Sequence, residues 1–247
     1  MAELEADVDA AWRMAFLGAR QIAAQETVFV GIGAPCQAAM LARRLGNADM
    51  TMIFESGVIG ADPQEMPLST GSPSVAKGAK MTTDMLGVFA LLQRGGIGLG
   101  ILSGAEVDAA GNLNSTVLGS YAQPRLRLPG SGGAHDIALL CRRLMILMPH
   151  DPRRFVERVD FVTSPGHGPY RARQGLGAGP AVLVTTRAVL AFRDGKPVLV
   201  AHFADLTAEQ AIEGIAWNIA FAPEVERIAV PDSSVSDIVN GFSGGMQ

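Results

Sequence analysis

One glutamate is better placed for chemistry than any other residue of this sequence. Glu55 follows the apolar run MTMIF of residues 50–54 and precedes Ser56 and Gly57. We predict that the apolar run is a strand of a parallel sheet, and active sites of such sheets form beyond the carboxyl ends of their strands. A carboxylate there can act as a nucleophile or a general base, with Ser56 and Gly57 as neighbouring substrate contacts. The alternative is a helix N-cap or an ordinary loop carboxylate.

A glycine-rich segment is the second candidate for chemistry. Its members are Gly130, Ser131, Gly132 and Gly133. Because the segment precedes a predicted helix over residues 134–143, its backbone N–H groups can face an anion or a developing oxyanion. The alternative is a flexible turn. His135 and Asp136 follow, but adjacent residues do not face each other on a helix, so we do not interpret them as an acid–base pair.

Two further loops contain candidate ligand-binding residues. Gly31 and Gly33 follow a short apolar strand, where a loop can line a ligand cleft. A dinucleotide-binding fingerprint needs a third glycine at the position of Cys36, so a tight strand-to-helix turn is the competing interpretation. Asn114 lies in the polar turn GNLNST of residues 111–116, for which a purely structural role is the alternative.

Other polar residues give weaker signals. Arg125 and Arg127 can meet phosphate or carboxylate groups or lie on a solvated face. The four histidines show no zinc-binding spacing, so we expect no metal site. Cys36 and Cys141 lie far apart in the sequence, which indicates two buried thiols in a reducing compartment.

Composition narrows the class of protein. The chain has 247 residues, of which 48% are hydrophobic and 18% charged, which favours a sizeable core over disorder. A net charge of -4 argues against a nucleic-acid partner. No apolar run has the length of a membrane span, and the acidic segment MAELEADVDAAW does not resemble a secretory or transit peptide. We therefore expect a cytoplasmic protein without a membrane partner.

The elements around Glu55 alternate between helix and strand patterns. We predict a helix over residues 4–25, a strand at 27–30, a helix at 36–45 and a strand at 50–54. A strand, glycine loop, helix and strand in this order form a βα unit of a parallel sheet. The sequence therefore predicts an α/β fold with an open, mostly parallel sheet and flanking helices.

The second half of the chain favours antiparallel pairing. Three apolar segments near residues 182–201 are predicted strands, and Asp194-Gly195 is a hairpin turn between two of them. We also expect a strand at 160–163, a capped helix at 208–219 and fraying from residue 233 onward. No linker interrupts the chain, so we predict a single domain over residues 1–247.

Several stretches occur in an order that resembles a known family, the β subunits of family I coenzyme A transferases. The resemblance is closest to the glutaconate CoA-transferase branch and spans roughly residues 15–205. The stretches are VFVGIGAPCQAAMLARR, MIFESG, LSGAEVDAAGNLNST, LRLPGSGGAHDIA, RRFVERVDFVTSPG and GPAVLVTTRAVLAF.

The resemblance implies a covalent mechanism centred on Glu55. In this family the corresponding glutamate attacks an acyl-CoA thioester, and a glutamyl–CoA thioester then forms by ping-pong kinetics. The glycines of the family's oxyanion site correspond to Gly132 and Gly133. Gly31, Gly33, Ser56, Gly57, Asn114 and Ser131 are the expected contacts to substrate or CoA. The coenzyme A thioester is a substrate, and no metal or permanently bound cofactor is implied.

The resemblance also implies a partner. Family members need two homologous halves, so a separate α subunit is expected, in an α2β2 or larger hetero-oligomer with the active site at the α–β interface. The small-molecule partners are an acyl-CoA and a carboxylic acid. The alternative is an acyl-CoA hydrolase or ring-opening enzyme of the same fold, and the presence of Glu55 favours the transferase.

Overall fold

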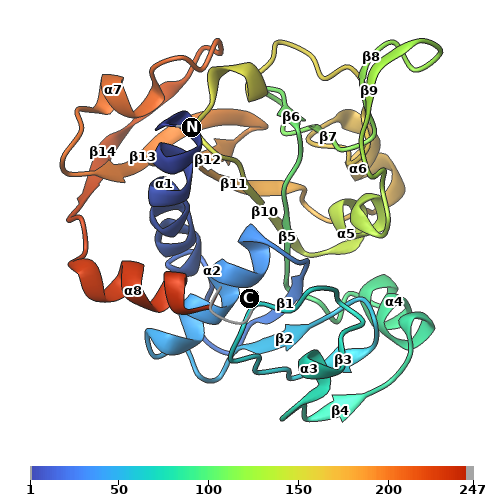
Figure 1. Cartoon of the computed structure of the whole chain (residues 1–247). Helices are drawn as coiled ribbons and strands as arrows, with labels where there is room; N and C mark the ends of the chain where they lie inside the picture. The colour runs from blue at the N-terminus through green and yellow to red at the C-terminus, as the bar shows by residue number, and fades with distance from the viewer. Residues whose placement is uncertain (1, 243–247) are drawn as a thin grey trace. The chain divides into compact units, whose positions relative to one another are not determined.

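The computed structural model describes residues 2–242, which form two compact units. The first unit comprises Met1–Ile101 and Pro231–Gln247, and the second comprises Leu102–Val230. Each unit is built around its own run of strands, which Figure 1 colours from blue to green in the first and from green to red in the second. The expectation of a single domain over the whole chain stays a prediction.

The first unit contains five strands in the order β5-β1-β2-β3-β4. Their bounds are β1 Thr27–Val30, β2 Thr51–Ile53, β3 Val58–Ile59, β4 Met81–Thr82 and β5 Leu99–Leu102. β1 pairs in parallel with both β2 and β5, as predicted for the βα unit. β3 and β4 extend the sheet as antiparallel strands that the sequence analysis did not anticipate.

Helices of the first unit cover this sheet. They are α1 Ala2–Ala19, α2 Ala34–Arg44, α3 Pro73–Ala76, α4 Met85–Gln93 and α8 Ser233–Gly241. α1 packs against α2 and α8. α2 is mostly buried, and it ends at Arg44 before Gly46, whose positive φ of 105° suits glycine at a helix end. On α4, the Phe89 ring packs edge-on against Phe29 of β1, with ring centroids 5.9 Å apart.

The strands next to Glu55 are buried on both faces. Residues of β1, β2 and β5 with at most 2% exposure are Val28, Phe29, Val30, Met52, Ile53, Leu99 and Ile101. Such continuous apolar runs are typical of parallel strands covered on both sides. The central strands therefore hold the loops at their carboxyl ends on a rigid base.

The second unit contains a mixed run of strands in the order β14-β13-β12-β11-β10. Their bounds are β10 Arg143–Leu147, β11 Pro180–Val184, β12 Ala188–Arg193, β13 Lys196–Phe203 and β14 Ala220–Ile228. β11, β12 and β13 pair antiparallel, which confirms the predicted antiparallel segment. Arg193 pairs with Lys196, and Asp194 and Gly195 between them both have positive φ, as expected for the predicted two-residue hairpin turn.

Short elements complete the second unit. They are β6 Glu106–Val107, β7 Leu113–Asn114, β8 Val117–Gly119, β9 Pro124–Arg127, α5 Ala134–Leu140, the 3-10 helix η1 Pro152–Arg154, α6 Pro169–Gln174 and α7 Ala208–Ile212. β6 pairs with β7 and β8 with β9, both antiparallel. No helix among the described residues is long and apolar enough to cross a membrane.

Three predicted elements differ from the structure. Residues 160–163 do not form a strand, because the Asp160 N–H donates to the Glu106 side chain instead of to a sheet partner. The predicted helix at 208–219 has the predicted capping box but ends at Ile212, just before Gly214 with its φ of 84°. The segment after residue 233 forms α8, capped by the Asp232 carboxylate, which accepts from the Ser234 N–H.

Candidate functional site

Glu55 lies at the tip of a tight turn between β2 and β3. Gly57 N–H donates to the Phe54 carbonyl over 3.0 Å, and Phe54 N–H donates to the Val58 carbonyl over 2.9 Å. Glu55 and Ser56 are therefore the two central residues of a β-turn. Glu55 is half-buried, and no described residue of the first unit gives its carboxylate a hydrogen bond or an ion pair. Its side chain is thus held at a fixed point with both oxygens available to a substrate.

The turn that carries Glu55 is fixed by Gly57. Gly57 has a φ of 109°, and a Cβ at this position would collide with the backbone carbonyl of Thr83. The Thr83 N–H in turn donates to the Gly57 carbonyl over 2.8 Å. Ser56 is anchored as well, because its hydroxyl donates to the Thr70 carbonyl over 2.6 Å. The turn therefore needs glycine for both its backbone angle and its close contact.

Gly31 and Gly33 lie on the same edge of the sheet as Glu55. Phe29 of β1 pairs with Ile53 of β2 in parallel register, so two residues further along Gly31 is level with Glu55. Gly33 has a φ of 81° and precedes α2, and added Cβ atoms at either glycine would meet nothing within 4 Å. The structure therefore brings these two glycines, Glu55 and Ser56 together, with open space beside the glycines.

The second candidate group, Ser131 to Gly133, lies in the second unit and leads into α5. Gly132 has a φ of 47°, and Ala134 N–H donates to the Ser131 carbonyl over 2.9 Å, which closes a turn. Among the described residues of the second unit, the N–H groups of Gly132 and Gly133 have no acceptor. Gly132 is exposed and Gly133 is buried. These two donors have the freedom that an oxyanion site requires.

The loop before α5 is tied to two neighbouring segments. Ser115 and Gly130 exchange two hydrogen bonds, of 2.8 Å between backbones and 2.9 Å from the serine hydroxyl. The buried Thr163 hydroxyl accepts from the Ser115 N–H over 2.9 Å and shares a 2.7 Å hydrogen bond with the Thr116 hydroxyl. The segments around residues 115, 130 and 163 therefore form one hydrogen-bonded support, which we call the glycine-loop platform.

Asn114 is an internal strut of this region. Its side-chain amide is fully buried and donates to the Glu106 carboxylate over 2.7 Å and to the Val117 carbonyl over 2.6 Å. Its Oδ1 accepts from the N–H groups of Thr116 and Val117. All four hydrogen-bonding positions of the amide are thus used inside the protein. The role in substrate binding stays a prediction, and this geometry favours the structural alternative.

Arg125 and Arg127 lie on β9, in the exposed β8–β9 hairpin. The Arg127 guanidinium is 4.7 Å from the centroid of the Tyr121 ring and donates to the Tyr121 carbonyl over 3.0 Å. Tyr121 stacks in turn on Phe161, with centroids 5.4 Å apart. Arg127 is therefore engaged within the hairpin, whereas Arg125 is exposed.

Arg171 organises the long loop between residues 164 and 180, and sequence reasoning missed it. Its guanidinium donates to four backbone carbonyls at 2.6–3.0 Å, those of Ala138, Pro165, Gly166 and Gly177. Arg171 is only 5% exposed. An arginine between glycines and prolines, next to Tyr170, was the available signal, but its carbonyl partners come from segments that only the fold brings together.

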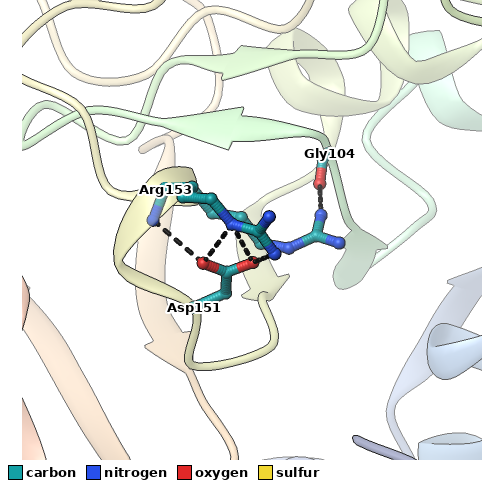
Figure 2. A network of polar contacts seen from close by, with 4 residues as sticks. Gly104, Asp151 and Arg153 are labelled. Atoms are coloured by element: carbon teal, nitrogen blue, oxygen red, sulfur yellow. Dashed lines mark hydrogen bonds and ion pairs between the residues drawn. The ribbon is translucent and has the colours of Figure 1, made fainter. Parts of the chain in front are cut away.

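A smaller polar network fixes the 3-10 helix of the second unit. Asp151 accepts hydrogen bonds from the backbone and guanidinium of Arg153, the closest at 2.7 Å (Figure 2). This contact holds the pKa of the Asp151 carboxyl below its usual range. Arg154 is half-buried and donates to the Gly104 carbonyl over 3.2 Å, although we expected both arginines at the surface.

The cysteines and histidines give no metal site. Cys36 and Cys141 are both buried free thiols, as predicted, and burial raises the pKa of each to about 12. Among the described residues, no group of three or more histidine, cysteine, aspartate or glutamate side chains could hold a metal ion. The reactive groups at the candidate site are therefore a carboxylate and backbone N–H donors.

Comparison with known proteins gives consistent relatives. The family model for coenzyme A transferases matches residues 13–216. The chain is 38% identical over 225 residues to the β-type subunit of 3-oxoadipate CoA-transferase from Pseudomonas knackmussii, covering 88% of this chain and 86% of that protein. It is 33% identical over 235 residues to the β-type subunit of glutaconate CoA-transferase from Acidaminococcus fermentans, covering 90% and 87%.

Solved structures agree with the sequence relatives. The crystal structure of glutaconate CoA-transferase from Acidaminococcus fermentans superposes with a TM-score of 0.85 at 29% identity, covering 95% of this chain and 94% of that chain. The decarboxylase AibA/AibB has a TM-score of 0.78 at 23% identity over 95% of this chain and 94% of that one, which is a likeness of fold alone. The predicted fold class and resemblance are thus confirmed. The chain belongs to the coenzyme A transferase family, as one of its β-type subunits.

Proposed function

We propose that this chain, with a separate α subunit, transfers coenzyme A from an acyl-CoA to a carboxylic acid through a thioester on Glu55. The observation that carries the proposal is the position of Glu55. Its half-buried carboxylate, without a protein partner in the first unit, stands at the carboxyl end of a buried parallel strand. A carboxylate used for a salt bridge or a helix cap would show the partner for that role.

The proposed reaction balances without a metal or a redox group. The Glu55 carboxylate attacks the acyl-CoA carbonyl, the C–S bond breaks, and CoA thiolate leaves from an acyl–glutamyl anhydride. The thiolate attacks the glutamyl carbonyl, which gives the glutamyl–CoA thioester and releases the first acid as its carboxylate. The acceptor carboxylate then attacks this thioester, and the same two steps in reverse yield the new acyl-CoA and free Glu55.

Backbone donors of the glycine loop suit the charge that develops in these steps. Each attack makes a tetrahedral oxyanion, and two preorganised N–H groups can stabilise it. The N–H groups of Gly132 and Gly133 have no acceptor among the described residues of the second unit, which supports this role. A free carboxylate is a weak nucleophile toward a thioester, so binding energy from CoA atoms remote from the sulfur must make up the difference. We assign Gly31, Gly33, Gly57 and Ser131 to the loops that contact CoA or substrate.

The partner and the substrate class follow from the relatives' names. The 3-oxoadipate and glutaconate relatives are each named as one lettered component of a transferase, which implies a second, α-type component. We therefore infer an α–β hetero-oligomer, α2β2 or larger. Both names denote dicarboxylic acids, so we infer a dicarboxylic acyl group for this chain. We place the reaction in the cytoplasm, with no permanently bound cofactor. The hydrolase or ring-opening alternative has no observation in its favour.

The test is transfer by the reconstituted α–β complex. We expect CoA transfer from glutaryl-CoA to a second carboxylic acid, with turnover that depends on the acceptor. Glu55→Gln should reduce kcat by about four orders of magnitude or more, because it removes the nucleophile. Glu65→Gln, at an exposed glutamate of the same unit, is the matched control and should keep the wild-type rate. Full activity of Glu55→Gln, or equal turnover with water alone, would refute the proposal.

A further inference from the structure

His135 is an oriented imidazole at the rim of the glycine-loop platform. It stands two residues after Gly133, in the first turn of α5. Its Nδ1 lies 3.0 Å from the Thr163 carbonyl oxygen, and the residue is exposed. A carbonyl oxygen only accepts hydrogen bonds, so Nδ1 must carry a proton. The contact therefore fixes both the ring orientation and the nitrogen that remains for other partners, which is Nε2.

The group that holds His135 is itself rigid. The backbone of Thr163 donates to the Leu113 carbonyl over 2.9 Å, and its hydroxyl is used by Ser115 and Thr116. Thr163 is only 3% exposed. An imidazole anchored to such a buried carbonyl loses little further entropy when a ligand binds, which is the usual arrangement of functional histidines. Nothing in the proposed transfer steps uses this side chain.

We propose that His135 binds the second carboxylate of a dicarboxylic substrate through Nε2. This inference rests on the proposed function and deepens it, because it names the residue that selects the substrate class. With Nδ1 already donating to Thr163, a proton taken up on Nε2 makes the ring a cation whose free N–H points at the ligand. A carboxylate is the ligand that stabilises this form, through a charge-assisted hydrogen bond.

The spacing fits a short dicarboxylate. Residues two apart on a helix have Cα atoms about 5.4 Å apart. Gly133, whose N–H is the proposed oxyanion donor, and His135 have this relation at the start of α5. One substrate can therefore place its reacting carbonyl at the glycine and its other carboxylate at the imidazole, with a chain of a few carbon atoms between them.

The other cations near the glycine loop fit this role less well. Arg127 is already stacked on Tyr121 and bonded to its carbonyl. Arg125 is exposed on the same hairpin, and its side chain has no anchor among the described residues of the second unit. His135 is the group that combines exposure with a fixed orientation. The arginines provide the competing arm of the test.

The experiment compares two acceptors that differ only at the far end. Glutarate has a second carboxylate where pentanoate has a methyl group, and both are used with glutaryl-CoA as donor in the reconstituted complex. We expect His135→Phe to lower the glutarate-to-pentanoate ratio of kcat/KM by about tenfold or more, the loss of one charge-assisted contact. His135→Lys should restore much of the ratio, because it supplies a cation, which a purely structural role would not explain.

Controls separate this inference from the proposed function. Asp136→Asn, at the exposed neighbour on α5, should leave the ratio as in the wild type. Transfer to both acids with an unchanged ratio in His135→Phe would overturn the inference and leave the transferase intact. A ratio that falls in Arg125→Ala/Arg127→Ala but not in His135→Phe would overturn it as well. A wild-type complex that transfers CoA to neither acid would refute the proposed function itself.

Discussion

The turn that presents Glu55 gives the sharpest prediction about structure. Gly57→Ala places a methyl group against the Thr83 carbonyl at a φ of 109°. The left-handed backbone costs an L-residue about 1–2 kcal/mol. The backbone shift needed to relieve the collision also weakens two hydrogen bonds, from Gly57 to Phe54 and from Thr83 to Gly57, at about 1 kcal/mol each. We therefore expect a total loss of about 3–4 kcal/mol of unfolding free energy.

A matched glycine isolates the collision from the backbone angle. Gly46 has a similar φ of 105°, but a Cβ there would meet nothing within 4 Å. Gly46→Ala should therefore cost only about 1–2 kcal/mol. Urea unfolding measures the difference, and kinetics of the reconstituted complex should show a lower kcat for Gly57→Ala alone, because Glu55 is displaced. Equal destabilisation of the two variants, or an unchanged kcat for Gly57→Ala, would refute this reasoning.

Two more predictions concern stability. Arg171→Lys should cost about 2 kcal/mol or more in urea unfolding, because an ammonium cannot serve four carbonyls in the planar geometry of a guanidinium, whereas the exposed Arg173→Lys should cost almost nothing; equal effects would contradict the assigned role. Burial raises the pKa of the Cys36 and Cys141 thiols from 9.0 to about 12, so the native chain should resist iodoacetamide at pH 8 and be labelled once unfolded. Since the unfolded thiols ionise first, stability should be constant below pH 9 and fall by about 1 kcal/mol per thiol and pH unit from there toward 12; rapid native labelling would refute this.

Local patterns predicted the elements whose form depends on neighbouring residues. The strand-helix-strand unit before Glu55 and the Asp194-Gly195 turn depend on apolar runs and backbone preferences that lie within a few residues. The capping box of Thr207 and Gln210 was also correct, but the length of its helix was not. Gly214 ends that helix, and one glycine against a helical pattern does not reveal its φ in advance.

The candidate site was predictable in its residues and not in its supports. Glu55 and the glycine loop stand out by type and position, and the structure places each on an ordered turn. Arg171 and the bond from His135 to Thr163 could not be read, because they join segments that are 28 or more residues apart or backbone atoms without any sequence signature. Asn114 shows the converse, since a polar residue in a conspicuous turn serves the fold.

The central claim is that Glu55 carries CoA during turnover. The most direct measurement is borohydride trapping of the reconstituted complex with glutaryl-CoA, followed by mass spectrometry of the peptide that contains Glu55. Reduction of a glutamyl–CoA thioester leaves an alcohol about 14 Da lighter than the acid. We predict this loss at Glu55 and at no other glutamate. An active complex that releases CoA while Glu55 stays unmodified would contradict the account.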